Sequence, residues 1–449
     1  MNTLPASRNN DESLIEEFQN TFVPPPIRHI EDTGLSSLWL QDLILKILYY
    51  QGYLSGFRIA EELALPFGGV VDQLLENLKR EKLVEVKPVQ QMGLGEGGYT
   101  YSTTGLGLER AQEAITRCQY VGPAPVPVQD YNKAILSQSR ARTMVRDQDL
   151  REAFSDLVLS DQLYERIGPA VNSGTSIFLY GPPGNGKTSI ARAIGGLHPN
   201  QSMYIPYALY IEGQVVKLYD SVNHQILPEE VNHLTGTGML KESLRRDLRW
   251  VHIQRPFIVV GGELTLAGLD LVFDDTNKFY EAPFQVKANG GMLLIDDFGR
   301  QLVRPRDLLN RWIVPLENRI DYLTMHTGRK VEIPFDVLVV FSTNLPPKDL
   351  VDEAFLRRLR HKIEIGNPNY DEYREIFQKV AAKKGISYSD SGLAYLLQEW
   401  YIRQNRKLRA SHPRDLCDQI QDIARYLNQD PDMSPQMIDR AASAFFVEI

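Results

Sequence analysis

Gly181-Pro182-Pro183-Gly184-Asn185-Gly186-Lys187-Thr188 decides the fold of this chain. The stretch fits G-x-x-x-x-G-K-[ST] at every fixed position. It lies between an apolar run, Ile177 to Tyr180, and a helical pattern that begins at Ser189. A glycine loop between a strand and a helix N-terminus turns backbone N–H groups and partial positive charge toward a phosphate chain. Lys187 is expected to reach the β- and γ-phosphates and Thr188 to hold Mg²⁺; the alternative is a glycine-rich turn that binds nothing.

The bulk composition is that of an ordinary globular protein. The length of 449 residues indicates several domains. The net charge of −8 argues against a nucleic-acid or membrane surface that extends over the whole chain. We find no apolar stretch of membrane-spanning length and no signal core. Cys118 and Cys417 are too far apart in sequence to indicate a disulfide framework, so we expect a protein of the reducing cytoplasm.

The second motif is acidic and follows an apolar run. Gly290-Gly291-Met292-Leu293-Leu294-Ile295 leads into Asp296-Asp297. A continuous apolar run is typical of a strand buried on both faces, and parallel sheets present ligands at the carboxyl ends of their strands. Asp296 is expected to position Mg²⁺ and Asp297 to polarise the attacking water; the alternative is a solvated acidic turn.

A third apolar run, Val337 to Phe341, ends in Ser342-Thr343-Asn344. By the same reasoning Asn344 lies at the carboxyl end of a strand, within reach of the γ-phosphate or the attacking water. The alternative is that Asn344 only forms a turn.

These three motifs, in this order, resemble Walker A, Walker B and sensor 1 of the AAA+ ATPase family. The resemblance covers about residues 150–449 and implies an α/β P-loop fold with a C-terminal helical lid, ATP and Mg²⁺ as cofactors, and a homo-oligomeric ring, expected to be a hexamer. It also implies an arginine finger at Arg358, with Arg357 and Arg360 as alternatives, and a sensor 2 arginine at Arg414. Each arginine is alternatively part of a surface ion pair. Many members carry Asp-Glu where this chain has Asp296-Asp297, which leaves the rate of hydrolysis open.

The segment between Walker A and Walker B is long, because Lys187 and Asp296 are 109 residues apart. We expect a hairpin from Tyr204 to Leu218 and loops near Gly261 and Asn277. A helix near Leu308 and a hairpin from Asp321 to Ile333 resemble the MoxR-like and magnesium-chelatase-like branch of AAA+ proteins. In that branch such loops line a central pore, so Phe279 and Tyr280 are candidates for gripping a client, or alternatively cover a core edge.

The remaining sequence suggests five parts. They are a disordered tail (1–34), a winged-helix-like domain (35–120), a proline-rich linker (121–149), an AAA+ α/β domain (150–366) and a helical lid (367–449). The front domain carries eight Lys and Arg against ten Asp and Glu. DNA binding depends on neutralising phosphates, so this balance favours a protein contact over DNA.

The sequence therefore predicts an ATPase that assembles into a ring and remodels a macromolecular client, which we expect to be a protein, in a chaperone-like way. One alternative is a DNA-associated protein that acts in transcription, replication or transposition. The other is a nucleotide-binding scaffold with little hydrolysis.

Overall fold

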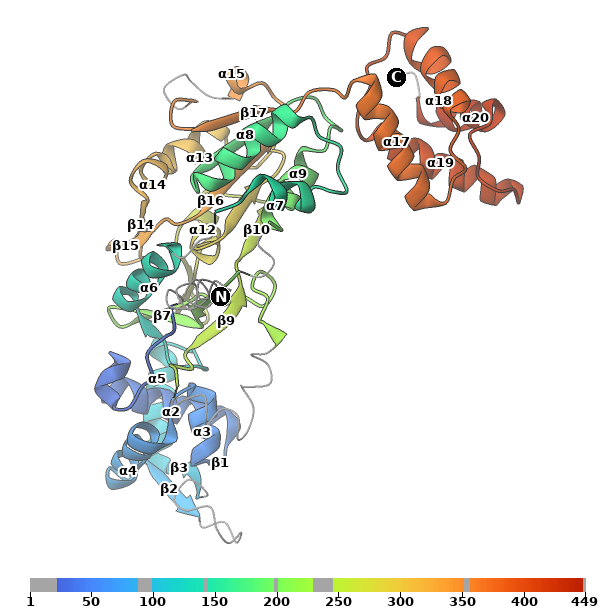
Figure 1. The fold of residues 1–449 in the computed structure, drawn as a ribbon. Coiled ribbons are helices and arrows are strands. Elements are labelled where there is room, and N and C mark those ends of the chain that lie inside the picture. Colours follow the sequence, from blue (N-terminus) through green and yellow to red (C-terminus); the bar gives the residue numbers. More distant parts are fainter. Residues whose placement is uncertain are drawn as a thin grey trace, which may run out of the picture.

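The computed structural model describes residues 22–87, 99–140, 144–197, 201–228, 245–350 and 356–446. Figure 1 shows an elongated chain: a helical module formed by α2 to α5 (blue), a layer of strands, an α/β unit, and a C-terminal helical unit to one side. The glycine-rich segment 93–98, for which the sequence favours a turn, and residues 352–355 lie outside these ranges. No helix within them is long and apolar enough to cross a membrane.

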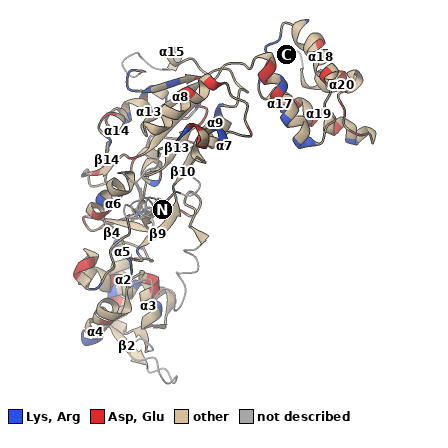
Figure 2. Cartoon of the chain, in the orientation of Figure 1, with Lys and Arg blue, Asp and Glu red and all other residues tan. Residues whose placement is uncertain are grey.

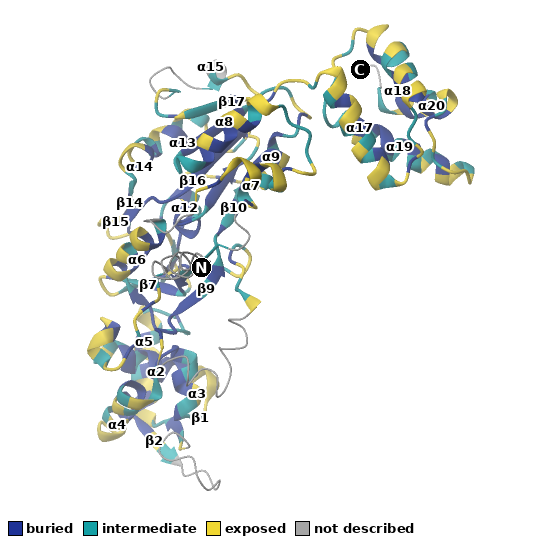
Figure 3. Cartoon of the chain, in the orientation of Figure 1, coloured by how far each residue is buried: buried dark blue, intermediate teal, exposed yellow. Residues whose placement is uncertain are grey.

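A five-stranded parallel sheet forms the core of the α/β unit, as predicted. The strands lie in the order β10-β13-β16-β5-β17, and every neighbouring pair is parallel. They are β5 (Ser176–Tyr180), β10 (Phe257–Val260), β13 (Met292–Ile295), β16 (Leu338–Thr343) and β17 (His361–Glu364). The central strands are dark blue in Figure 3 because both of their faces are covered. This double coverage explains why they read as continuous apolar runs.

Helices cover the two faces of this sheet with separate hydrophobic clusters. Ile177, Leu294 and Val340 pack toward α8 and α9, whereas Phe178 and Phe341 pack toward α13 and α14. The helices of the unit are α7 (Asp147–Ala153), α8 (Asp161–Asn172), α9 (Lys187–Gly195), α12 (Phe284–Lys287), α13 (Pro305–Arg311), α14 (Ile313–Asn318) and α15 (Pro347–Leu350). Alternate residues of one strand thus serve opposite cores.

The predicted proline-rich linker is wrong for much of 121–149. Val126 pairs with Leu209 in a second five-stranded sheet, of order β11-β12-β8-β7-β4, and Tyr131 is fully buried on α6 beside it. Two antiparallel pairs, β6–β9 and β14–β15, complete this middle layer. Its elements are β4 (Val126–Pro127), α6 (Val128–Arg140), β6 (Ser202–Pro206), β7 (Ala208–Ile211), β8 (Gln214–Lys217), β9 (Trp250–Gln254), η4 (Ala267–Leu269), β11 (Val272–Asp274), β12 (Phe279–Glu281), β14 (Ile320–Thr324) and β15 (Lys330–Pro334). Pro127 is tolerated because β4 is an edge strand.

Both predicted hairpins form in this layer. Glu212 and Gly213 connect β7 to β8 with positive φ at both positions, as a tight two-residue hairpin requires. The hairpin β14–β15 turns around Gly328. Of the two alternatives for Tyr280, the structure supports the core position and not the gripping role, because its side chain is 0% exposed and its ring packs on Phe273. Phe279 is half-buried against Tyr120, so this strand covers a core edge.

The N-terminal module has the predicted order of helices followed by a hairpin. Its elements are η1 (Ile30–Thr33), α2 (Ser37–Gln51), β1 (Leu54–Ser55), α3 (Gly56–Leu63), η2 (Phe67–Val71), α4 (Asp72–Arg80), β2 (Val84–Lys87), β3 (Thr100–Thr103) and α5 (Gly105–Arg117). The short β1, which the sequence did not indicate, extends the hairpin to an antiparallel sheet of order β1-β3-β2. Ser36, Ser55 and Thr104 cap the N-termini of α2, α3 and α5.

Residues 22–34 correct the prediction of a disordered tail over 1–34. Ile27 and Thr33 are buried, and the buried Arg249 donates to the carbonyls of Thr33 and Pro125. Asp247 pairs with Arg249 and donates its backbone N–H to the Pro24 carbonyl. The charged pair fixes the N-terminal segment against the middle layer because each buried charge needs its partners.

The C-terminal unit is a helical bundle, as predicted. Its helices are α17 (Tyr370–Lys384), α18 (Asp390–Leu396), η5 (Leu397–Ile402), α19 (His412–Leu427) and α20 (Pro435–Phe445), and they enclose one hydrophobic cluster. Cys417 is buried in that cluster, and both it and Cys118 are free thiols.

Candidate functional site

The three predicted motifs meet at one edge of the parallel sheet. The phosphate loop follows β5, Asp296 and Asp297 follow β13, and Asn344 follows β16. These strands are neighbours and run in the same direction. Their carboxyl ends therefore place the side chains around one position, where α/β sheets bind ligands.

The phosphate loop adopts a backbone that needs its glycines. Gly181, Gly184 and Gly186 have φ values of 141°, 81° and 81°. A Cβ atom on Gly181 would lie 2.2 Å from the Ile365 carbonyl oxygen. The loop therefore packs against the segment after β17, where a side chain would not fit.

Lys187 is held at the centre of this arrangement. Its Nζ donates to the carbonyl oxygens of Gly181 and Pro182, both at 2.9 Å, and to Asn344 Oδ1 at 2.7 Å. Burial lowers the pKa of Lys187, while the nearby Asp297 and Asp296 oppose that shift. A desolvated ammonium that keeps some of its donors on weak carbonyl acceptors is suited to bind a stronger acceptor such as phosphate.

The acidic pair is divided between two directions. Asp296 Oδ1 accepts from Thr188 Oγ1 at 3.0 Å. Asp297 has a left-handed backbone with φ of 48°, and its Oδ1 lies 3.4 Å from Asn344 Nδ2. Asp296 is therefore directed at the hydroxyl of the phosphate loop, and Asp297 at the polar end of β16.

A cavity of about 440 Å³ lies beside the loop, between the α/β unit and the helical bundle. Its walls include every motif residue from Pro183 to Ser189, together with Asp297 and Asn344. From the bundle, Arg414 lines the same cavity, where its guanidinium pairs with the neighbouring Asp415. The structure thus brings Arg414 to the predicted site although 227 residues separate it from Lys187.

Apolar residues that the sequence motifs did not reveal complete this cavity. They are Leu157, Val158 and Leu159 from the segment before α8, and Ile376 and Val380 from α17. The two segments contribute apolar side chains to the same cavity. A flat apolar group such as a nucleobase would fit between these side chains. No sequence signal marked them, because a loop of Leu and Val between two helices also suits ordinary core packing.

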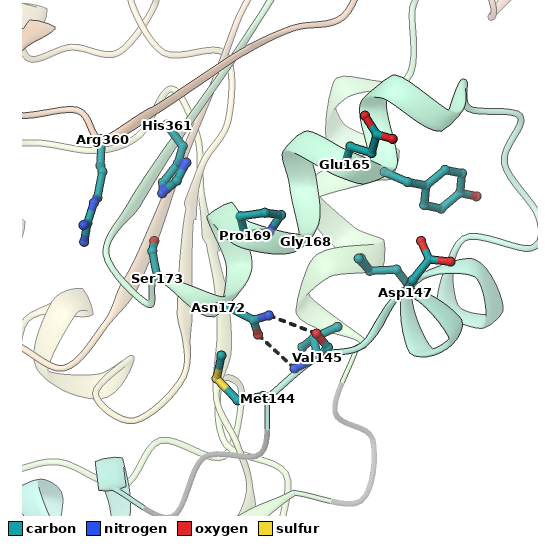
Figure 4. Close-up of a pocket in the computed structure, with 12 residues that line it drawn as sticks. Met144, Val145, Asp147, Glu165, Gly168, Pro169, Asn172, Ser173, Arg360 and His361 are labelled. Carbon is teal, nitrogen blue, oxygen red and sulfur yellow. Dashed lines mark hydrogen bonds between the residues drawn. The ribbon is translucent and has the colours of Figure 1, made fainter.

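The three candidate finger arginines lie away from this cavity. Arg358 Nε donates to Glu317 Oε1 at 2.6 Å, and both side chains are partly exposed. Arg357 is exposed, and Arg360 lines a different cavity of about 790 Å³ with His361 and Asn172 (Figure 4). None of the three is among the described residues that line the cavity beside Lys187.

The larger cavity does not carry the motif chemistry. It lies along α8, where Asn172 exchanges two hydrogen bonds with the Val145 backbone (Figure 4). Its walls contain none of the phosphate-loop residues. The smaller cavity is therefore the candidate nucleotide site, since size alone does not define a site.

Comparison with known proteins adds distant relatives. The chain is 27% identical over 236 residues to a vesicle-fusing ATPase from Dictyostelium discoideum, a match that covers 52% of this chain but 25% of that protein. It is 24% identical over 418 residues to a 26S proteasome regulatory subunit 6B homolog from the same organism, covering 84% of this chain and 85% of that one. The chain thus spans only a quarter of the length of the first of these relatives.

Two other comparisons concern parts of the fold. Residues 369–444, the helical bundle, match a family described as "Domain of unknown function (DUF8689)". Among solved structures, NtrX from Brucella abortus in complex with ADP is 17% identical, with a TM-score of 0.38 over 74% of this chain and 64% of that one. RuvB from Thermotoga maritima is 14% identical, with a TM-score of 0.37 over 67% of this chain and 74% of that one. TM-scores below 0.5 do not support a transfer of function.

The relatives found by sequence are AAA+ ATPases. The strand order, the three motifs at the carboxyl edge and the helical bundle agree with that relationship. The α/β unit of this chain therefore has the P-loop fold of the AAA+ ATPases, and its sequence is similar to theirs.

Proposed function

We propose that this protein is an AAA+ ATPase that binds ATP and Mg²⁺, hydrolyses ATP in an oligomeric ring, and remodels a protein client. One observation carries the proposal: Lys187, Thr188, Asp297 and Asn344 from the α/β unit meet Arg414 from the bundle around a single cavity. A phosphate chain in that cavity would face two cations, one hydroxyl and one carboxylate from separate segments. Positioning and charge stabilisation of this kind are the main requirements of phosphoryl transfer.

Each residue has a distinct role in this proposal. Lys187 and the loop N–H groups bind the phosphates, and Arg414 binds them from the bundle side. Asp297 orients a water and accepts its proton, and Asn344, between Lys187 and Asp297, fixes that water's direction. The second carboxylate is shorter than the glutamate of many related proteins, yet its position 3.4 Å from Asn344 directs it at the same point.

The residues present fit a bound Mg²⁺. Mg²⁺ prefers hard oxygen ligands and takes few from the protein, the rest being water and phosphate. The Thr188 hydroxyl and an Asp296 carboxylate oxygen lie together at 3.0 Å. Among the described residues, no cluster of three or more His, Cys, Asp and Glu suits a metal ion held by protein alone. When bound, Mg²⁺ supplies neutralisation of phosphate charge, while Thr188 and Asp296 hold it in place.

We infer that a neighbouring subunit completes the site. Arg358 is bonded to Glu317 on its own chain and lies outside the cavity. Arginine in trans would stabilise the charge that develops on the transferred phosphoryl group, so that turnover requires the ring, which we propose to be a hexamer. Arg357 and Arg360 remain the alternative positions for this role.

A protein client is favoured by the charges of the N-terminal module, which we infer to be a winged helix. Its helix α4, the counterpart of a recognition helix, carries Asp72 and Glu76, and Lys79 pairs with Glu76. Figure 2 shows both acidic and basic segments on this module. Arg110 pairs with Asp42 and Glu81 on the same module. Cations that are already paired within the module are poorly placed to neutralise DNA phosphates. We therefore propose a chaperone-like role in the cytoplasm.

ATPase turnover measured across a range of protein concentrations tests the proposal. Specific activity that rises with concentration and disappears in Lys187→Ala is expected of a ring with shared sites. Tight ADP binding without turnover, with or without added clients, would favour the nucleotide-binding scaffold instead. DNA binding that weakens steeply with salt would overturn the protein-client assignment.

A further inference from the structure

Asn185 belongs to the phosphate loop, and its side chain forms hydrogen bonds with two other segments of the chain. The residue is 5% exposed. Its Nδ2 donates to Asn367 Oδ1 at 2.8 Å, and its Oδ1 accepts from the Ala410 backbone N–H at 3.2 Å. Asn367 lies between β17 and α17, and Ala410 lies two residues before α19. Both polar atoms of this side chain therefore bond to the chain segments that precede α17 and α19.

The neighbouring glycine shows how closely the two units approach. The Ser411 backbone N–H donates to the Gly184 carbonyl at 2.7 Å. A Cβ atom on Gly184 would lie 2.6 Å from Ser411 Oγ. The segment before α19 thus lies directly on the phosphate loop, and Asn185 and Gly184 together bind two consecutive residues of it.

These contacts fix the start of the helix that carries Arg414. Ala410 and Ser411 immediately precede α19, and Arg414 lies in its first turn. A shift of this segment would move Arg414 relative to Lys187, because a helix transmits the displacement of its end as a rigid body. Arg414 itself has only an ion pair with the adjacent Asp415 among the contacts described, which does not fix the helix.

We propose that Asn185 is a positioning residue that sets Arg414 over the phosphate loop by bridging Asn367 and Ala410. This inference rests on the proposed ATPase function and assigns to Asn185 a role different from phosphate binding. The loop then binds the phosphates and also holds the bundle. We call the contacts of Asn185 with Asn367 and Ala410 the clasp. A movement of the loop around the phosphates is passed to the bundle through this side chain together with the Ser411–Gly184 bond.

The clasp is testable at Asn367, which is exposed and does not line the cavity. Asn367→Ala removes the acceptor for Asn185 Nδ2, whereas Asn367→Asp keeps an oxygen at that place. Asn310→Ala, at an exposed asparagine of α13, is the matched control. We expect Asn367→Ala to lower kcat for ATP by about 10- to 100-fold, as misplaced catalytic groups do, and Asn367→Asp to restore most of it. The affinity for ADP should stay close to that of the wild type, because the Ser411–Gly184 bond remains.

A double-mutant cycle and hydrogen exchange complete the test on the full chain. Asn185→Ala should lower kcat, and Asn367→Ala should add little to it, since the two remove one link. The Ala410 amide should exchange faster in Asn185→Ala and Asn367→Ala than in the wild type and in Asn367→Asp. Equal loss of ADP affinity and kcat in Asn367→Ala, additive effects, or unchanged exchange at Ala410 would each overturn the proposal.

The exchange measurement separates this inference from the proposed function. If the wild-type protein bound ADP but did not hydrolyse ATP, the ATPase assignment would fail. Protection of the Ala410 amide that depends on Asn185 would still show the clasp in that case. Its absence in an active enzyme would refute the clasp alone.

Discussion

Thr188 Oγ1 donates to Asp296 Oδ1 at 3.0 Å, although the two residues are 108 positions apart in the chain. The contact joins the helix after the phosphate loop to the end of β13, two strands away from β5 in the sheet. It is the pairing of hydroxyl and carboxylate that a Mg²⁺–nucleotide site needs, formed by residues from two different motifs.

Replacing Asp297 should separate nucleotide binding from hydrolysis. Asp297→Asn keeps the size of the side chain but cannot accept a proton from water, so kcat should fall by at least about 100-fold. Binding of ADP, measured by fluorescence titration with a labelled analogue, should be retained, whereas Lys187→Ala should weaken it. Turnover near the wild-type level in Asp297→Asn would exclude Asp297 as the base.

Mixing two inactive variants should restore activity if Arg358 acts in trans. Arg358→Ala has an intact site but no finger, and Asp297→Asn has a finger but no base. In mixed rings some interfaces combine an intact Asp297 with a neighbouring Arg358, so phosphate release should reappear after mixing under conditions that allow subunit exchange. Glu317→Ala removes the partner of Arg358 in its own chain but leaves Arg358 intact. This variant should therefore still supply the finger to a neighbouring subunit in mixed rings. No recovery, with mixed rings shown by sizing, would contradict Arg358 as the finger.

The ion pairs of Lys287 should stabilise the middle layer. Lys287 is 7% exposed at its side chain, and its Nζ contacts Asp220 Oδ2 at 2.9 Å and Glu281 Oε1 at 2.6 Å. Lys287→Met leaves two carboxylates without their cation, so the free energy of unfolding should fall by about 3 kcal/mol. Urea denaturation measures the change, with Lys133→Met on an exposed lysine of α6 as the control. A loss no larger than that of the control would mean that water replaces Lys287 at both carboxylates.

The same cluster should respond to acid. Burial alone would raise the pKa of Asp220, but its hydrogen bonds with Lys287, Val222 and Asn223 lower it from 3.8 to about 2. A carboxylate with a lowered pKa stabilises the folded state above its unfolded pKa and loses that effect as the pH falls through its folded pKa. The difference in urea stability between wild type and Asp220→Asn should therefore shrink from pH 4 to pH 2. A constant difference over that range would contradict the shift.

Stability of the helical bundle should depend on His412 at mildly acid pH. Burial, with a further contribution from the positive charge of Arg409, lowers the pKa of His412 to about 4, and its Nδ1 lies 2.8 Å from the Tyr401 hydroxyl. The unfolded chain takes up the proton first, so stability is complete above pH 6.5 and falls as the pH drops toward 4. His412→Asn, which keeps an acceptor for Tyr401, should show a smaller loss between pH 7 and pH 5 in scanning calorimetry. An equal loss in both proteins would assign the acid sensitivity to other groups.

Some features of the fold could be predicted from the sequence because they depend on local backbone preference and on burial. The glycines of 181–186 and the turn at Glu212-Gly213 mark backbone positions with positive φ, and residue choice there is nearly local. The apolar runs ending in Asp296 and Asn344 predicted buried parallel strands, because burial on both faces leaves no room for polar alternation. Two strands of the middle layer, Val126–Pro127 and Phe279–Glu281, were missed, because they are short and their pairing partners are distant in sequence.

The sequence by itself determined the P-loop, the parallel core and the identity of most residues at the candidate site, because these follow from local backbone preference and from hydrophobic periodicity. Only the tertiary structure decided that Leu157 and Val380 line the cavity, that Tyr280 is buried, and that the Asn185 side chain bonds to the segments before α17 and α19. Such facts depend on contacts between separate segments, which for Asn185 and Ala410 are 225 positions apart. The packing of helices and sheets decides which distant residue a side chain contacts. The hydrophobic periodicity of a single segment does not predict that partner.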